Sequence, residues 1–162
     1  MTQVEETTRA IEGFKALGFF PADYAASESG KVYASGGYWS VLRFPAFPAT
    51  LPACTIVAVL QQPFHAAYAD HQFAMGLEDS DGAPLGLDVQ GAFRASPGDD
   101  ARYGEPGVIP FAVPLYGLRF DRPGDYAFVL KVDGGEIARY AFHVVQVAGS
   151  GIVPRGPSPT DF

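Results

Sequence analysis

A chain of 162 residues can bury one core, and 48% hydrophobic against 18% charged residues can fill it without metal or disulfide support. The formal net charge of −7, with no basic stripe along the chain, argues against nucleic acid as a partner. The 19 glycines and 14 prolines separate short apolar runs, which is typical of short strands joined by turns. The composition therefore predicts an all-β domain.

The beginning of the chain and its single cysteine indicate the compartment. The N-terminal sequence M-T-Q-V-E-E-T-T-R is acidic and lacks the apolar region of a secretory signal. No apolar segment approaches the roughly 20 residues of a membrane-spanning helix. Cys54 lies within an apolar run, where a lone cysteine acts as a small hydrophobic residue. We therefore expect a cytoplasmic protein with no membrane partner and no cofactor.

Residues 1–13 form an N-terminal extension whose apolar residues have roughly helical spacing. Thr2 can cap a helix there with Glu5 three positions later, so the sequence allows a short N-terminal helix. From Phe14 to Tyr24, frequent aromatic residues instead predict a first strand that breaks at Pro21.

The next segments predict three strands. A strand at 31–34 is followed by Gly36 and Gly37, which predict a bulge or tight bend before a second strand at 38–42 that begins with Tyr38 and Trp39. Prolines at 45, 48 and 52 predict an extended loop. The run 55–60 is apolar on both faces and is the best candidate for a central strand.

Alternating apolar residues at 71–78 and 85–89 predict two half-buried strands that are joined by a turn at 79–82. A long surface loop follows at 96–107. The segment 111–118 reads as another strand, and Pro110 and Pro114 place it at a sheet edge.

The segment 120–147 is the most informative stretch because it reads as a complete β-hairpin with one aromatic face. A three-residue loop at 133–135, with Gly135 left-handed, places Phe128 opposite Tyr140 and Tyr126 opposite Phe142. Such a face requires a second sheet to cover it.

The turn D-R-P-G-D that precedes Tyr126 resembles a tyrosine corner, in which the phenol oxygen bonds to upstream backbone. We therefore expect an immunoglobulin-like antiparallel β-sandwich of about seven to nine strands over residues 14–147. Residues 148–162 form a tail rich in Gly, Pro and Ser that cannot build a core of its own.

Three groups of motifs carry a family resemblance: S-G-K-V-Y-A-S-G-G-Y-W, D-H-Q-F-A-M-G-L-E-D-S-D-G and P-G-D-Y-A-F-V-L-K-V-D-G-G. Together they resemble a family of small bacterial proteins of unknown function, over about residues 17–145. The resemblance implies the sandwich fold and a bacterial source, and it transfers no activity.

The nearest approach to a metal-ligand set is His65, Asp70 and His71, which a folded-back loop could bring together. The alternative is a structural histidine at 71, with its nitrogens satisfied by backbone or by Asp70, and His65 in a loop. Zinc sites usually have more ligands at tighter spacing, which favours the structural alternative.

The other acidic motifs and the possible nucleophiles give no evidence of a metal site or an active site. The turn at 78–82 has three carboxylates but lacks the later glutamate of a calcium-binding loop, so we interpret it as a hairpin turn. No nucleophile motif, phosphate-binding loop or dinucleotide fingerprint is present, so we do not expect an enzyme.

Three aromatic residues are candidates for partner binding. Tyr38 and Trp39 follow two glycines and could form an exposed anchor, although a single tryptophan in a sandwich more often packs in the core. The terminal Phe162 could dock into a groove of another subunit, and the alternative is a disordered tail. We therefore expect a non-catalytic interaction or structural module with a protein partner or self-association, and metal or small-ligand binding as the alternative.

Overall fold

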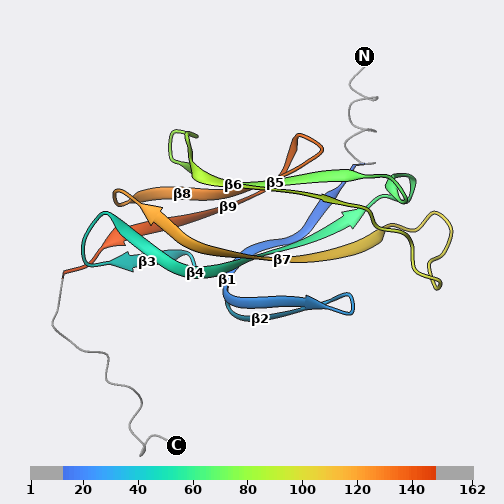
Figure 1. Ribbon diagram of the computed structural model, residues 1–162, viewed down its shortest axis with the longest axis horizontal. Helices are drawn as coiled ribbons and strands as arrows, with labels where there is room; N and C mark the ends of the chain where they lie inside the picture. Colours follow the sequence, from blue (N-terminus) through green and yellow to red (C-terminus); the bar gives the residue numbers. More distant parts are fainter. Residues whose placement is uncertain (1–12, 149–162) are drawn as a thin grey trace, which may run out of the picture.

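The computed structural model describes residues 13–148, which form two β-sheets packed face to face (Figure 1). This part of the chain contains nine strands and one short 3-10 helix. The strands are β1 (Lys15–Glu28), β2 (Lys31–Gly37), β3 (Val41–Phe44), β4 (Ala49–Gln62), β5 (His71–Asp79), β6 (Pro84–Phe93), β7 (Gly107–Phe120), β8 (Gly124–Val132) and β9 (Gly135–Gln146). The 3-10 helix η1 (Phe64–Ala66) follows β4. The prediction of an all-β sandwich is confirmed.

One sheet has the strand order β2-β1-β4-β7, and the other has the order β3-β9-β8-β5-β6. All neighbouring strands are antiparallel except β3 and β9, which run parallel. The predicted central strand is confirmed, since residues 55–61 of β4 lie between β1 and β7. The predicted edge position of the 111–118 segment is also confirmed, because β7 pairs only with β4 within the described residues.

The core lies between the two sheets and follows the period-two pattern of the strands. Even-numbered residues of β4 face inward and meet the even-numbered residues of β8. The fully buried large side chains of this core are Phe120, Phe128, Phe142, Ile56, Leu60, Leu77, Leu130 and Val144. Burying one such side chain stabilises the fold by about 1.5–3 kcal/mol.

The β8–β9 hairpin has the predicted cross-strand pairs but a different turn. Phe128 lies opposite Tyr140 and Tyr126 opposite Phe142, as predicted. The predicted three-residue loop is wrong, because Val132 pairs with Gly135 around a two-residue turn. Asp133 and Gly134 both have positive φ (50° and 83°), which matches the turn that suits strand twist. A bulge next to Leu130 then restores the pairing of the aromatic residues.

The tyrosine at the start of β8 makes the predicted corner bond. The hydroxyl of Tyr126 donates a hydrogen bond to the carbonyl of Arg122 over 2.6 Å. The ring of Tyr126 packs edge-on against Phe120, so the bond fixes the incoming turn to the core.

The first strand does not break at Pro21. β1 continues to Glu28, since Pro21 lies opposite Ile56 in a strand that tolerates the missing N–H. After Ala22 the strand leaves β4 and pairs with β2 instead. Figure 1 shows the resulting β1–β2 hairpin lying beneath the sheet of β4 and β7.

The β1–β2 hairpin covers the outer face of its own sheet. Ala22 and Ala25 of β1 form a small second core with Val57 of β4, which is fully buried although it points away from the main core. Val32 of β2 packs against the same cluster. This explains why the run at 55–60 is apolar on both faces.

The two glycines that end β2, Gly36 and Gly37, mark a change of sheet, whereas a bulge or bend within one strand was expected. Gly36 has a φ of +65°, and the N–H of Tyr38 donates to the carbonyl of Pro21. The chain then crosses to the other sheet as β3, beside β9. The predicted proline-rich loop is shorter than expected, because Pro52 already lies within β4.

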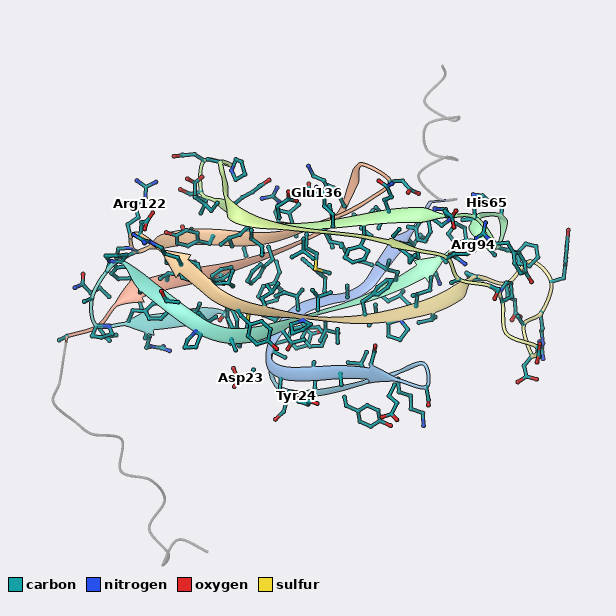
Figure 2. All side chains as sticks on the ribbon, viewed as in Figure 1. Asp23, Tyr24, His65, Arg94, Arg122 and Glu136 are labelled. Atoms are coloured by element: carbon teal, nitrogen blue, oxygen red, sulfur yellow. The ribbon has the colours of Figure 1, made fainter. Side chains whose placement is uncertain are left out.

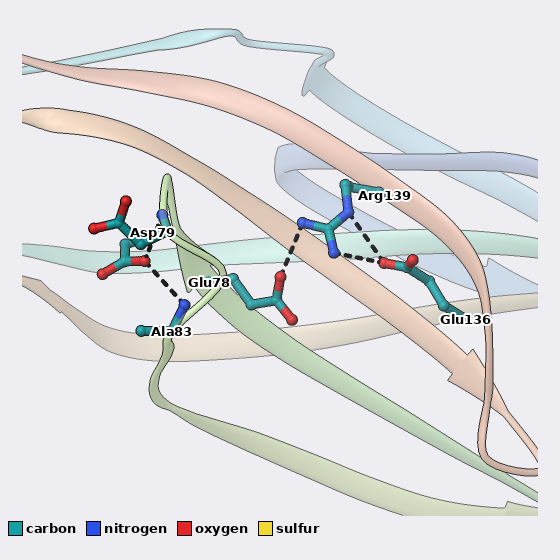
Figure 3. A network of polar contacts seen from close by, with 6 residues as sticks. Glu78, Asp79, Ala83, Glu136 and Arg139 are labelled. Atoms are coloured by element: carbon teal, nitrogen blue, oxygen red, sulfur yellow. Dashed lines mark hydrogen bonds and ion pairs between the residues drawn. The ribbon is translucent and has the colours of Figure 1, made fainter.

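The predicted turn at 79–82 is confirmed between β5 and β6. The Oδ1 atom of Asp79 accepts hydrogen bonds from the N–H groups of Asp81 and Ala83, each over 2.9 Å (Figure 3). The carboxylate therefore holds the turn of the hairpin.

In the part of the chain that the structure describes, no helix is long and apolar enough to cross a membrane. The predicted N-terminal helix, the 148–162 tail beyond Ala148 and its terminal Phe162 lie outside the described residues.

Candidate functional site

Two regions of the molecule gather the candidate residues. The first is one end of the sandwich, where η1, the 94–106 loop and the β8–β9 turn meet strand β5. Figure 2 shows His65 and Arg94 at this end and Arg122 at the opposite one. The second is the β1–β2 hairpin, where Tyr24 points away from the body.

His71 is the most constrained polar residue at the loop end. It is buried at the start of β5, with Phe14 edge-on to its ring at 4.8 Å. Its Nδ1 atom lies 2.7 Å from Oδ2 of Asp133, and its Nε2 atom lies 2.7 Å from the carbonyl oxygen of Ala66. A carbonyl and an ionised carboxylate only accept, so this geometry is fully satisfied when both ring nitrogens carry a proton, which is the imidazolium form.

The pKa values of this pair agree with the geometry. Burial lowers the pKa of His71, but the bonds to Ala66 and Asp133 and the nearby charges outweigh it, so the net shift is upward. The pKa of Asp133 is lowered, first by the backbone N–H of Gln72, against the effect of burial, and further by His71. The pair therefore favours its doubly charged state.

The predicted ligands His65, Asp70 and His71 are not brought together as a metal-ligand set. Metal binding requires a free lone pair on neutral imidazole, and each nitrogen of His71 already lies 2.7 Å from an oxygen of Asp133 or Ala66. Asp70 is exposed and pairs with Arg94 (Oδ1 to Nε, 3.0 Å), while His65 is exposed on η1. Between residues 13 and 148, no group of three His, Cys, Asp or Glu side chains could hold a metal ion.

A surface ion network lies on the outer face of the five-stranded sheet (Figure 3). Arg139 of β9 reaches Glu78 of β5 over 2.9 Å and Glu136 over 2.8 Å. It lies opposite Val129, which is buried although it faces outward. We interpret the network as a structural cover for this apolar position.

Cys54 is buried in the main core, as predicted. Burial, with a smaller contribution from the charge of Asp23, raises the pKa of its thiol to about 11. The thiol is therefore protonated at neutral pH, which is typical of a structural cysteine.

The two aromatic anchors predicted next to Gly37 have different surroundings. Trp39 packs edge-on against Phe142 at 5.5 Å, which is the core-packing alternative. Tyr38 is exposed and stacks on Phe20 with ring centroids 4.0 Å apart. Of the two predicted anchors, Tyr38 is therefore the exposed one.

The outward face of the β1–β2 hairpin carries two exposed tyrosines. Tyr24 is 65% exposed and pairs with Ser35, while Tyr33 is 55% exposed and pairs with Ala26. In this register the two tyrosines are diagonal neighbours on one face. β2 pairs only with β1 among the described residues, so its other edge is open.

Sequence reasoning missed two residues of the loop end. Asp133 is 62 positions from His71, and its place in the sequence indicated only a turn. Gln62 is buried at the end of β4, where two adjacent glutamines after an apolar run were the only available signal. Both depend on contacts between distant segments.

Several solved structures resemble the fold at a distance. A Pseudomonas fluorescens alkylpurine DNA glycosylase AlkC, bound to DNA containing an abasic site analog, matches 81% of this chain and 30% of its own, at 12% identity and a TM-score of 0.40. A mutant Listeria innocua beta-glucosidase in complex with laminaribiose matches 81% of this chain and 16% of its own, at 12% identity and a TM-score of 0.39. This chain thus spans less than a third of either protein.

No curated protein matches this chain. A family model matches residues 17–145, which is most of the described sandwich and the same span as the resemblance in the sequence, so that resemblance is confirmed. The chain belongs to the family of unknown function DUF6941.

Proposed function

We propose that this protein is a non-catalytic interaction module of the cytoplasm that self-associates through strand β2. The observation that carries the proposal is an open edge strand with two exposed tyrosines beside it. Tyrosine is enriched in protein interfaces because its ring buries a large area at a small entropic cost. We assign the module to the immunoglobulin-like sandwiches, and the hydrogen bond from the Tyr126 hydroxyl to the Arg122 carbonyl supports this assignment.

The four edge strands differ in how well they are protected against pairing. β7 carries Pro110 and Pro114, β3 is only four residues long, and β6 carries Asp88. Prolines, charges and short length are the usual means of protecting an edge. β2 has seven residues and no proline, and its single charge, Lys31, lies at its first position, so the rest of the strand is the edge best suited to receive another strand.

A second copy of this chain fits the open edge of β2. Lys31 is the only charge on the strand, and antiparallel pairing places the two lysines at opposite ends of the joined strands. A twofold axis would also bring the tyrosine faces of both hairpins onto one continuous surface. The net charge of −7 supports a protein partner over nucleic acid.

The proposal is tested by hydrogen exchange of the full chain at low and high protein concentration. Pairing through β2 adds backbone hydrogen bonds, so amide protection between Lys31 and Gly37 should rise with concentration. The edge strand β7 serves as the internal control and should not change. Concentration-independent exchange in β2 would contradict self-association through this edge.

A further inference from the structure

A pocket of about 200 Å³ lies at the loop end of the sandwich, away from strand β2. η1 and the following residues line it on one side and the 94–106 loop on the other. Most lining residues are apolar or small, including Phe64, Pro97, Pro106 and Ile109. The floor is different, because Gln62 of β4 contributes a buried amide side chain.

Only the nitrogen of the Gln62 side-chain amide has a hydrogen-bond partner. The residue is 4% exposed, and its Nε2 atom donates to the carbonyl of Ala95 over 3.4 Å. That carbonyl also accepts from the N–H of Tyr68 at 3.1 Å. Because a carbonyl only accepts, the amide nitrogen must face Ala95, and the oxygen takes the other position.

The Oε1 atom of Gln62 has no hydrogen-bond partner among the residues from 13 to 148. Buried polar atoms are almost always paired, since an unpaired acceptor loses its hydration without replacement. The atom belongs to a residue that lines the pocket, so a molecule in the pocket can supply the missing donor.

The size and charge of the pocket define the class of molecule. A single water molecule needs a cavity volume of about 10–15 Å³, whereas an apolar cavity of about 150 Å³ accommodates benzene. The pocket is thus the size of one ring. No lysine or arginine lines it and Glu105 does, so an anion is disfavoured.

We propose that this pocket binds a small uncharged molecule of about one ring, which donates one O–H or N–H hydrogen bond to Oε1 of Gln62. The apolar body of the ligand packs between Phe64 and the prolines of the 94–106 loop. This site is independent of self-association through β2, so either proposal can fail while the other holds.

Phenol and toluene are the test probes, since they have similar size and differ in the donor. Their dissociation constants for the full chain are measured by NMR titration, following the backbone amides of Ala67 and Ser96, which line the pocket and are unchanged in every variant. The ratio of the two constants is then compared with the ratio in Gln62→Leu, which cancels the difference in hydrophobicity. We expect the relative preference for phenol to fall about three- to tenfold in this variant.

Two further variants keep the test decisive. Gln61→Leu makes the same chemical change one position earlier, where the side chain lies outside the pocket, and the phenol preference should remain. Ala101→Leu fills the pocket from the exposed loop, and both probes should lose their binding. This variant decides the location of the site even if Gln62→Leu does not fold.

Three results would overturn the proposal. One is an unchanged phenol-to-toluene ratio in Gln62→Leu, which would mean that Oε1 does not receive the donor. Another is binding that survives Ala101→Leu, which would place the probes elsewhere. The third is no binding of either probe to the natural chain at millimolar concentration, as expected if water alone satisfies Gln62.

Discussion

The Oδ2 atom of Asp133, in the turn between β8 and β9, lies 2.7 Å from the Nδ1 atom of His71 at the start of β5. The same turn is also joined to Gln72: Oδ1 of Asp133 accepts the N–H of Gln72 at 3.0 Å, and the N–H of Asp133 donates to the carbonyl of Gln72 at 2.8 Å. His71 in turn donates to the carbonyl of Ala66, the last residue of η1. One imidazolium therefore connects three segments of the loop end.

Replacing His71 by Gln should destabilise the protein in a pH-dependent manner. The pKa of His71 is raised in the folded state, so its contribution is full below about pH 6.5 and is lost as the pH rises through the folded-state value. The pKa of Asp133 is lowered, so its contribution is lost as the pH falls below about 4. The loss in unfolding free energy should be about 1–2 kcal/mol near pH 5 and smaller at pH 9.

Urea unfolding at the two pH values measures this difference. His143→Gln is the matched control, because His143 also pairs with a carboxylate, that of Asp125, but on the exposed surface. Its effect should stay within a few tenths of a kcal/mol. Equal losses for His71→Gln at pH 5 and pH 9 would show that the imidazolium does not hold the loop end.

Removing one hydroxyl tests the corner at the start of β8. Tyr126→Phe loses the bond to the Arg122 carbonyl but keeps the ring in the core, so the unfolding free energy should fall by about 1 kcal/mol. Tyr116→Phe makes the same change at a tyrosine that is 77% exposed, and it should have no measurable effect. If both variants unfold at the same denaturant concentration, the corner bond does not stabilise the sandwich.

Gly36 allows the change of sheet and should not tolerate a side chain. It has a φ of +65°, and an added Cβ would lie 2.3 Å from Oδ2 of Asp23. Gly30 has a similar φ of +71° with open space around it. Gly36→Ala should therefore lower the unfolding temperature more than Gly30→Ala, which reports the backbone strain alone.

The double variant Asp23→Ala/Gly36→Ala separates strain from the steric contact. Removing the carboxylate should reduce the loss in unfolding temperature to the value seen for Gly30→Ala. No difference between Gly36→Ala and Gly30→Ala would mean that Asp23 rotates away without cost.

The sequence predicted those parts of the fold that local rules determine. Period-two alternation and turn residues were sufficient for β5, its return strand β6 and the hairpin of β8 and β9, and Pro110 and Pro114 indicated an edge. The hairpin loop was wrong because a two-residue turn plus a bulge gives the same side-chain faces as a three-residue loop. Periodicity alone does not distinguish these two solutions.

The remaining features depend on distant contacts. The course of β1 through Pro21 requires the pairing with β4, and the second core under Val57 requires the β1–β2 hairpin to fold back. The candidate site shows the same limit. His71 was recognised as a residue of interest, but its acidic partner is Asp133 and not the neighbouring Asp70, because the strand order brings the β8–β9 turn to β5.

Sedimentation velocity of the full chain, compared with Tyr33→Lys and Tyr116→Lys, tests self-association through β2 most directly. Both substitutions place a lysine at an exposed tyrosine, one on β2 and the other on the opposite edge of the same sheet. Lysine on an edge strand opposes pairing, and in a symmetric pair it adds like charges to both copies. We expect the natural chain and Tyr116→Lys to sediment as a dimer at micromolar concentration and Tyr33→Lys as a monomer. A natural chain that stays monomeric, or a dimer that Tyr33→Lys leaves intact, would contradict the account.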